Sequence, residues 1–429
     1  MAKKLLATLA ALCLLLVMGS VGASAELYTN TYANGEFHIL VISDAHQLAE
    51  EDANLTAYID AAIKYMTVEN RSPIDMVLFL GDSVTGSGCA SEATIRQAVG
   101  RLLAPLKAAN IPFTLVFGDQ DYGDIPGGAI SRADLLDIWK SEGGGLFLEP
   151  DEQFASADAG ATNFCYTIKK NVYKDEYGKL TDEPLTGDNE NELVSSNLFA
   201  QLFLFDTGSK NPGETGYDYV RTSQLDWFKE MNNPSVPAYV FQHIPVQEIY
   251  TNGYFVKSPF NLELPGTRKV GDTSYMNLAN YTKMIGMLLE TPSASGYSDG
   301  WFETITAPGN VQAAFFGNNP KNNIIEKWTE EGIDLLQLPG AAWNGASSNF
   351  MTRGGTFVTL RETNPFNPNI PMENKTTYGS DYFTYRQASR VQGSGVTSTI
   401  NGFGDFIQIF PYMLQNLLIA ICSPFRSIG

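Results

Sequence analysis

Short apolar runs alternate with longer amphipathic stretches along most of the chain. The runs are rich in Val, Ile, Leu and Phe, and they are short, as buried β-strands are. They lie at residues 37–42, 76–80, 113–117, 197–205, 238–242, 311–316 and 356–360. The stretches between them place apolar side chains at helical spacing, and several open on a residue that can cap a helix. The predicted helices cover residues 53–68, 91–109, 131–139, 222–231 and 274–289.

This alternation of strands and helices predicts an α/β architecture. Residues 169–192 break the alternation, because they are polar and charged and contain turn residues throughout. We interpret them as a long hairpin or loop insertion into one domain that covers residues 34–390.

The chain changes character after residue 390. A Gly/Ser/Thr-rich stretch precedes an apolar segment, residues 406–422, which Gln408, Pro411, Gln415 and Asn416 interrupt. We treat residues 391–429 as a C-terminal tail and favour a docked amphipathic helix. A lipid-anchor (GPI-type) signal and a membrane span are the alternatives, and the interruptions count against the span.

The N-terminus has the pattern of a secretory signal peptide over residues 1–25. Lys3 and Lys4 precede a short apolar run, and Ala23-Ser24-Ala25 forms a small-residue cleavage site. The protein is therefore expected in the secretory pathway or outside the cell, with cell-surface anchoring only through the tail. Asn-x-Ser/Thr sequons predict a glycoprotein where the host glycosylates its secreted proteins. They begin at Asn54, Asn70, Asn280 and Asn374.

Composition and charge exclude several classes of protein. Hydrophobic residues make up 44% and charged residues 17%, so the chain can bury a core. With 28 Lys and Arg against 47 Asp and Glu, the net charge of −19 disfavours nucleic-acid binding and a polybasic membrane contact. Of the four cysteines, Cys13 lies in the signal peptide, and the remaining three cannot all pair. Histidine-dependent chemistry must use His38, His46 or His243.

Polar side chains with metal-binding chemistry follow five of the apolar runs. They are Asp44 and His46, then Asp82, then Asp119, Gln120 and Asp121, then His243, and finally Asn318. Ligand sites in α/β sheets form at the carboxyl ends of strands, and carboxylates and imidazoles together suit a metal ion. Taken singly, Asp44 or Asp82 could simply cap the helix that follows it.

The order of these motifs resembles that of the calcineurin-like metallophosphoesterases. That family has D-x-H, then G-D, then G-N-H-D, then a His often followed by x-P, then G-H-x-H. The chain is most similar to the secreted, purple-acid-phosphatase-like branch, through Gln-His-Ile-Pro at 242–245 and Gly-Trp-Phe-Glu-Thr at 300–304. The resemblance covers about residues 37–360. It implies a four-layer α/β/β/α sandwich of two mixed sheets and a site for one or two divalent metal ions.

The resemblance also implies a role for each matching residue. Asp44 and His46 would bind the first metal, and Asp82 would bridge both metals. Asp119, where the family has Asn, and His243 would bind the second metal. Asn318 stands where the family has a second-metal His.

Two further family residues are replaced by residues that cannot do the same chemistry. Pro320 stands where the family has its last first-metal His, and proline offers no donor atom there. Gln120 stands where the family has the His that protonates the leaving group, and an amide cannot do this near neutral pH. Asp121 is expected to orient its neighbours.

The surviving donor set is rich in oxygen, which favours Mg²⁺, Mn²⁺ or Ca²⁺ over zinc. The resemblance also allows iron, although Thr85 replaces the Tyr ligand of the coloured enzymes. It implies a hydrolase of small phosphate monoesters. Because loss of a general acid costs about 10²–10⁴-fold in rate, that activity is expected to be weak. The alternative is an inactive relative, a pseudophosphatase that binds a phosphorylated ligand or partner in the old cleft.

Overall fold

The computed structural model describes most of the expected domain. The described residues are 27–28, 36–49, 53–69, 73–85, 88–89, 91–121, 130–156, 159–174, 177–178, 180–181, 192–208, 217–250, 255–257, 267–270, 273–277, 300–318, 320, 324–328, 331–342, 354–361, 377–379 and 383–387. The signal peptide at 1–25, the tail at 391–429 and the sequons at Asn70, Asn280 and Asn374 lie outside them. None of the helices in these ranges has the length and apolar character needed to cross a membrane.

The larger sheet has nine strands and mixed polarity. Its main path is β1-β6-β8-β9-β13-β15-β14, and β5 and β7 pair with β6. Strands β8, β9, β13 and β15 are parallel to one another, whereas β6 pairs with β8, and β14 with β15, in the antiparallel sense. The bounds are β1 Leu27–Tyr28, β5 Glu152–Ser156, β6 Gly160–Lys174, β7 Leu180–Thr181, β8 Glu192–Phe205, β9 Ala238–Gln242, β13 Val311–Phe316, β14 Ile324–Trp328 and β15 Ile333–Gln337.

The second sheet has six strands in the order β17-β18-β16-β2-β3-β4. Its strands β2, β3 and β4 are parallel, and β16 pairs with β2 in the antiparallel sense. The bounds are β2 Glu36–Ile42, β3 Met76–Leu80, β4 Phe113–Val116, β16 Thr356–Arg361, β17 Thr377–Gly379 and β18 Phe383–Gln387. A separate three-stranded antiparallel sheet contains β10 Phe255–Lys257, β11 Thr267–Val270 and β12 Thr273–Asn277.

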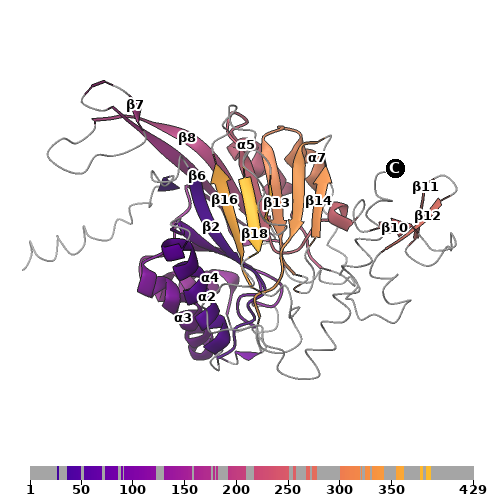
Figure 1. The fold of residues 1–429 in the computed structure, drawn as a ribbon. Coiled ribbons are helices and arrows are strands. Elements are labelled where there is room, and N and C mark those ends of the chain that lie inside the picture. The colour runs from indigo at the N-terminus through magenta and orange to yellow at the C-terminus, as the bar shows by residue number, and fades with distance from the viewer. Residues whose placement is uncertain are drawn as a thin grey trace, which may run out of the picture.

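Helices cover the outer faces of the two large sheets. In Figure 1, α2, α3 and α4 form one group beside β2, and α5 and α7 lie near β13 and β14. Ser91 and Ser131 cap α3 and α4 with reciprocal capping boxes, which explains where these helices begin. The bounds are α2 Ala53–Lys64, α3 Glu92–Ala109, α4 Arg132–Gly143, α5 Thr222–Met231 and α7 Trp301–Thr306. A π-helical turn, Tyr65–Glu69, follows α2, and a 3-10 helix covers Gln247–Tyr250.

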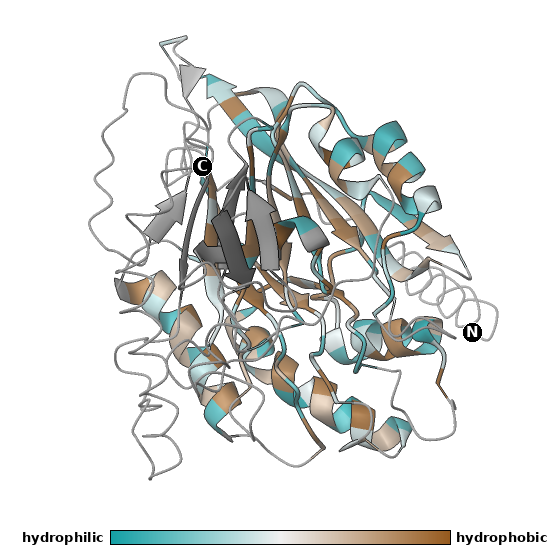
Figure 2. Cartoon of the chain, turned by 90° about the vertical axis from the view of Figure 1, so that its right-hand side faces the viewer, coloured by the Kyte–Doolittle hydropathy of each residue, from teal (hydrophilic) through white to brown (hydrophobic). Residues whose placement is uncertain are grey.

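Alternate residues of the strands divide the core into layers. Phe241 and Phe315 stack between the two sheets, with ring centroids 4.8 Å apart. Their neighbours Val240 and Phe316 face the other way, into a cluster that contains residues of α5 and α7. Apolar positions accordingly gather on the strands and on the inner sides of the helices (Figure 2). The predicted α/β/β/α sandwich of two mixed sheets is confirmed.

All seven strands predicted from the apolar runs are present. The polar segment at 169–192 is the hairpin expected, because β6 and β8 continue as a long antiparallel arm (Figure 1). The helix predicted at 274–289 is wrong for its first residues. Residues 274–277 belong to β12, where pairing with β10 and β11 overrides a weak helical pattern, and residues 278–289 lie outside the described ranges.

Candidate metal centre

The predicted site residues lie in the loops that follow β2, β3, β4, β9 and β13. Backbone hydrogen bonds join these loops to one another. Asp44 N donates to Gly81 O at 3.0 Å, and His46 N donates to Asp82 O at 2.9 Å. On the other sheet, Gly317 N donates to His243 O at 2.9 Å. These backbone bonds fix the loops relative to their neighbours in each sheet.

The backbone at the site adopts a strained conformation. Among the described non-glycine residues, five have a left-handed φ, and four of them are candidate ligands: Asp44 (49°), His46 (47°), Asp82 (49°) and Asn318 (68°). The fifth, Asn110, is the C-cap of α3. Such conformations cost about 1–3 kcal/mol each and persist only where the surroundings enforce them. Strain in the described backbone is thus concentrated at the site.

The side chains form two groups that share Asp82. In the first group, His46 Nε2 lies 4.0 Å from Asp44 Oδ1 and 4.0 Å from Asp82 Oδ2. In the second group, His243 Nε2 lies 3.3 Å from Asp82 Oδ1 and 3.6 Å from Asp119 Oδ1. Within each group the ligand atoms lie within 4.8 Å of one another. Two ligands that each lie 2.0–2.6 Å from one ion are at most about 5 Å apart, so each group has the spacing of a metal site.

Protein donors satisfy only part of each carboxylate. Ser43 Oγ donates to Asp44 Oδ2 at 2.5 Å, and Gln120 N donates to Asp82 Oδ1 at 2.8 Å. The side-chain atoms that face the centres of the two groups have no such hydrogen-bond partner. Four buried atoms without a hydrogen-bond partner are Asp44 Oδ1, Asp82 Oδ2, Asp119 Oδ1 and His243 Nε2. Buried polar atoms are almost always paired, so convergent acceptors of this kind fit a bound cation.

The orientation of His243 supports the same interpretation. Its Nδ1 lies 2.8 Å from the carbonyl oxygen of Leu80, which can only accept a hydrogen bond. Nδ1 must therefore carry the proton, and in the neutral ring Nε2 has a lone pair that faces Asp82 and Asp119. Metal-binding histidines are oriented in this way by a carbonyl or carboxylate behind them.

Glycine is required where two loops approach each other closely. A Cβ atom on Gly118 would lie 2.2 Å from Asp82 Oδ1, 2.5 Å from Asp82 N and 2.8 Å from His243 Cδ2. The glycine of the β4 loop therefore lets the β3 and β9 loops meet.

Charges at the site perturb one another because the groups are buried. Burial raises the pKa of Asp44 to about 6, and the neighbouring Asp82 charge adds to the effect. For Asp82, burial also opposes ionisation, but His243 outweighs it and the pKa falls below its usual value. Burial opposes a charge on His243 as well, yet Asp82 and Asp119 hold its pKa well above the usual range. When no cation is bound, the positive charge of protonated His243 compensates the negative charge of the neighbouring carboxylates.

The remaining predicted residues line these groups in different ways. Asp121 is buried, and its two oxygens accept Val84 N at 2.9 Å and Gly118 N at 2.8 Å, so it joins the β3 and β4 loops. Burial, then the charge of Asp82, raises its pKa to about 6. The side chain of Gln120 is half-buried. Asn318 is buried beside Gly317, where a Cβ atom would lie 3.1 Å from Asp44 Oδ2.

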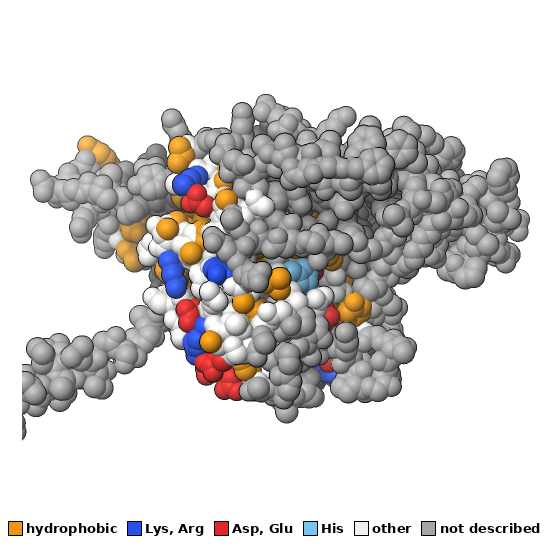
Figure 3. Space-filling model, turned by 90° about the horizontal axis from the view of Figure 1, so that it is seen from below, with side chains coloured by type: hydrophobic (Ala, Val, Ile, Leu, Met, Phe, Trp, Pro, Cys, Tyr) orange, Lys and Arg blue, Asp and Glu red, His pale blue; other side chains and the backbone are white. Residues whose placement is uncertain are grey.

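His46 marks the side from which the site can be reached. Its side chain is 11% exposed, whereas those of His38 and His243 are 3% and 0% exposed. In the view from below, a histidine side chain reaches the surface beside apolar and acidic groups (Figure 3). Thr85 Oγ1 lies 3.2 Å from His46 Nδ1 and helps to orient the ring.

His38 lies apart from the site, as a structural residue of β2. Its Nδ1 lies 3.0 Å from Thr359 Oγ1 on β16, and its Nε2 lies 3.6 Å from Glu36. Two other contributors to the site did not stand out in the sequence. Ser43 was visible in the first motif but had no assigned role, and the Leu80 carbonyl that orients His243 has no sequence signal.

Comparison with known proteins identifies the same family. The family model for the calcineurin-like phosphoesterases matches residues 37–268, which contain every candidate ligand except Asn318. Two relatives from Arabidopsis thaliana are similar over most of their length. The chain is 23% identical to one named "Probable inactive purple acid phosphatase 28" over 68% of this chain and 67% of the relative. It is 22% identical to "Probable inactive purple acid phosphatase 29" over 72% of this chain and 73% of the relative.

Two solved structures show a distant similarity to this chain. One is GAP50, described as the anchor in the inner membrane complex of Plasmodium, with a TM-score of 0.35, 11% identity and coverage of 76% of this chain and 82% of that chain. The other is the purple acid phosphatase PPD1 from yellow lupin (Lupinus luteus) seeds. Its TM-score is 0.39 at 12% identity, and the match covers 85% of this chain and 53% of that chain.

Proposed function

Because the chain belongs to the calcineurin-like phosphoesterase family, we propose that it binds a divalent cation and, through it, small phosphate monoesters, which it hydrolyses weakly. The observation that carries this proposal is the convergence of four buried, unpaired atoms from Asp44, Asp82, Asp119 and His243. A bound divalent ion polarises a phosphoryl oxygen and lowers the pKa of a bound water.

The second group of ligands is the better cation site. Asp82, Asp119 and His243 supply three donors, two of them anionic, and the Asn318 loop lies beside them. The first group has Asp44, His46 and the shared Asp82, but Pro320 offers no further donor. We therefore propose that one ion binds strongly, in the second group, and that the oxygen-rich donors select Mg²⁺, Mn²⁺ or Ca²⁺ over Zn²⁺.

The replacement of the general acid limits which substrates can react. Gln120 sits at the β4 loop with its backbone N–H on Asp82, where an amide side chain cannot deliver a proton. The leaving oxygen must then depart unprotonated. Hydrolysis should be confined to aryl esters and other esters with good leaving groups. Its rate should be about 10²–10⁴-fold lower than the rate of an enzyme that has a general acid.

A second candidate function has its own support. Both Arabidopsis relatives are named as inactive, and this chain lacks the general acid and one first-metal ligand. We propose as the alternative a pseudophosphatase that holds a phosphorylated small molecule or partner in the same cleft without turning it over.

One experiment separates these functions. The purified mature protein is analysed for bound metal and assayed with p-nitrophenyl phosphate and an alkyl phosphate, and phosphate binding is measured by calorimetry. Asp82→Asn is the site variant, and Lys229→Ala, on the exposed side of α5, is the matched control. Metal-dependent turnover of the aryl ester that only Asp82→Asn loses supports the weak enzyme. Phosphate binding without turnover supports the alternative, and a protein that neither hydrolyses the ester nor binds phosphate rejects both.

Localisation in the secretory pathway also belongs to this proposal. It rests on the signal-peptide pattern at 1–25 and is tested by N-terminal sequencing of the secreted protein, which should begin at Glu26. Asn54, exposed at the start of α2, is the sequon to examine for glycan mass. Any membrane attachment should depend on residues 391–429.

A further inference from the structure

A buried hydroxyl holds the loop that carries His243. Thr207 lies two residues beyond the end of β8, and its Oγ1 accepts Ile244 N at 3.2 Å. Ile244 directly follows His243, whose own carbonyl oxygen accepts Gly317 N at 2.9 Å. Thr207 is buried, so the Ile244 amide would be left unpaired away from water if this hydroxyl were lost. The turn after β9 is thus fixed on both sides of the ligand.

A second buried hydroxyl holds the loop that carries Asp119. Thr162 on β6 is fully buried, and its Oγ1 accepts Phe117 N at 3.0 Å, two residues before Asp119. Strand β4 and the loop after it belong to the six-stranded sheet, whereas β6 belongs to the nine-stranded sheet together with β9. The Thr162 contact therefore ties the Asp119 loop to the sheet that carries His243.

Asp206 fixes the direction of the Thr162 hydroxyl. Thr162 donates its hydroxyl to Asp206 Oδ2 at 3.1 Å and its backbone N–H to the same oxygen at 3.2 Å, and Asp206 Oδ1 pairs with Arg132. Because the hydroxyl proton is used on the carboxylate, a lone pair of Thr162 Oγ1 faces Phe117 N. Asp206 directly precedes Thr207, so one short segment after β8 orders both loops.

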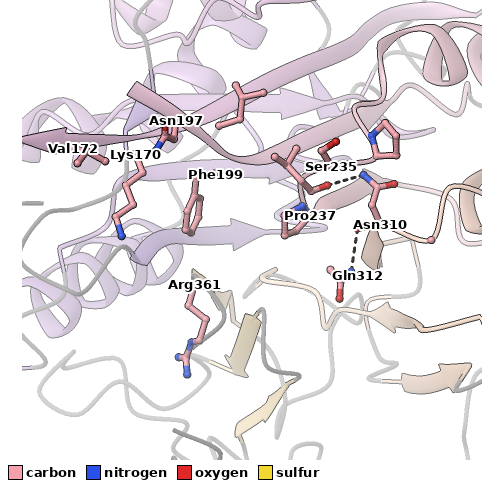
Figure 4. Close-up of a pocket in the computed structure, with 13 residues that line it drawn as sticks. Lys170, Val172, Asn197, Phe199, Ser235, Pro237, Asn310, Gln312 and Arg361 are labelled. Carbon is pink, nitrogen blue, oxygen red and sulfur yellow. Dashed lines mark hydrogen bonds between the residues drawn. The ribbon is translucent and has the colours of Figure 1, made fainter. Parts of the chain in front are cut away.

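The opposite end of β9 is anchored by Asn310, which immediately precedes β13. Asn310 Nδ2 donates to Val236 O at 2.7 Å, and the Asn310 backbone oxygen accepts Ala238 N, the first amide of β9, at 2.9 Å. Figure 4 shows hydrogen bonds of Asn310 at this end, beside a cavity of about 450 Å³. With one end of β9 held here, the position of His243 at the other end is set at the turn that Thr207 holds.

We propose that Thr162 and Thr207 are positioning residues for the second group of ligands. Their hydroxyls set where Asp119 and His243 stand relative to each other, and in this way they determine how tightly the group binds a cation. His243 Nε2 lies 3.6 Å from Asp119 Oδ1, and metal sites tolerate errors of only about 0.2 Å in ligand distances. This inference rests on the proposed cation site and adds the residues that tune its affinity.

The test replaces each hydroxyl by a methyl group of similar size, in Thr162→Val and, separately, in Thr207→Val. Thr162→Ser and Thr207→Ser keep the hydroxyl and are the conservative variants. Thr114→Val is the matched control, because Thr114 is also buried and its Oγ1 lies 2.6 Å from Tyr166 Oη on β6. Thr114 lies inside β4, however, where pairing with Leu78 of β3 holds the backbone. Stability is measured by urea denaturation in chelator, and Mn²⁺ affinity by calorimetry, on the mature protein.

We expect the Kd for Mn²⁺ to rise about 10–100-fold in each valine variant, the usual effect of losing a group that orients a metal ligand. The serine variants should recover most of the affinity. Thr114→Val should lose stability in chelator but keep the wild-type Kd, which separates positioning from a general loss of packing. The two threonines are tested independently, so one folded valine variant is enough to decide.

Two kinds of result would count against the proposal. A wild-type Kd in a folded Thr162→Val or Thr207→Val protein, or an equal rise in Thr114→Val, would overturn it while leaving the cation site in place. Failure of the wild-type protein itself to bind Mn²⁺ would reject the cation site, and this inference with it.

Discussion

Gly118→Ala should disrupt the metal centre without removing any ligand. The added Cβ atom would lie 2.2 Å from Asp82 Oδ1 and 2.5 Å from Asp82 N. A relaxed contact is about 3.5 Å, so the Asp82 carboxylate must move by about 1.3 Å. The carboxylate can rotate away, but the backbone nitrogen cannot, so the β3 loop itself must shift. Metal sites tolerate errors of only about 0.2 Å in ligand distances, and the shared ligand is the one displaced.

The magnitude follows from the two consequences of this clash. Overpacking costs about 1–3 kcal/mol of folding stability. Displacement of Asp82 should weaken metal affinity by about 10–100-fold or more, the range seen when groups that orient ligands are lost. Gly118 has no left-handed φ, so alanine introduces no backbone strain that could confuse the result.

Gly100→Ala is the matched control for this substitution. Gly100 lies inside α3, and its added Cβ would meet only Glu142 Oε2, at an ordinary 3.7 Å. There the change should stabilise the protein by about 0.5–1 kcal/mol, because alanine is the better helix former. Both variants are compared by urea denaturation in chelator and by calorimetric titration with Mn²⁺. Wild-type Mn²⁺ affinity in a folded Gly118→Ala protein would refute the geometry described for the site.

Three further predictions concern metal, pH and repair of the site. Saturating Mn²⁺ at about 100 times its Kd should stabilise the protein by about 2.7 kcal/mol over chelator, seen as a higher Tm, and Asp82→Asn should abolish the increase. Burial raises the pKa of Asp75 to about 7, so its ionisation destabilises the fold increasingly as pH rises from 4 to 8. At pH 4, Asp75→Asn should be as stable as wild type, and at pH 8 it should be more stable by roughly 2 kcal/mol. This is half of the free energy that corresponds to the whole pKa shift, because solvent reaches the group. Equal urea midpoints of the two proteins at pH 8 would contradict this prediction. Combining Gln120→His, Asn318→His and Pro320→His should raise p-nitrophenyl phosphate turnover, and an unchanged rate in a folded, metal-loaded protein would show that other positions also limit the reaction.

Most of the fold could be predicted from the sequence because buried strands leave a strong local signal. Runs such as 76–80 and 238–242 became β3 and β9 with the same bounds. The helix expected at 274–289 failed where β12 forms, because pairing with β10 and β11, which lie outside that segment, is not visible in the segment's own helical pattern. Strand β8 begins five residues earlier than predicted, and β6 was not among the predicted strands. The described part of the projecting arm has no buried face to create a pattern.

The site could be predicted only as a set of residues. Their order along the chain indicated which side chains would meet, and the structure brings Asp44, His46, Asp82, Asp119 and His243 together. What the sequence could not show is which atoms remain unpaired. That depends on where the Ser43 hydroxyl, the Gln120 backbone N–H and the Leu80 carbonyl lie, and the last two are backbone groups that any residue type would supply.

The distinction between a weak enzyme and a binding protein depends on residues that the framework does not need. Ala342 N donates to Asp44 O at 3.0 Å, and Gly340 N donates to Pro320 O at 2.9 Å, so backbone bonds hold these loops whatever side chain occupies position 320. Gln120 likewise contributes a backbone N–H, not its side chain, to Asp82. The strained φ angles at Asp44, His46 and Asp82 are enforced by the same loop contacts. Since the ligand geometry is built without the side chains at positions 120 and 320, changes there remove a proton donor and a ligand while the proposed cation-binding arrangement of Asp82, Asp119 and His243 stays in place.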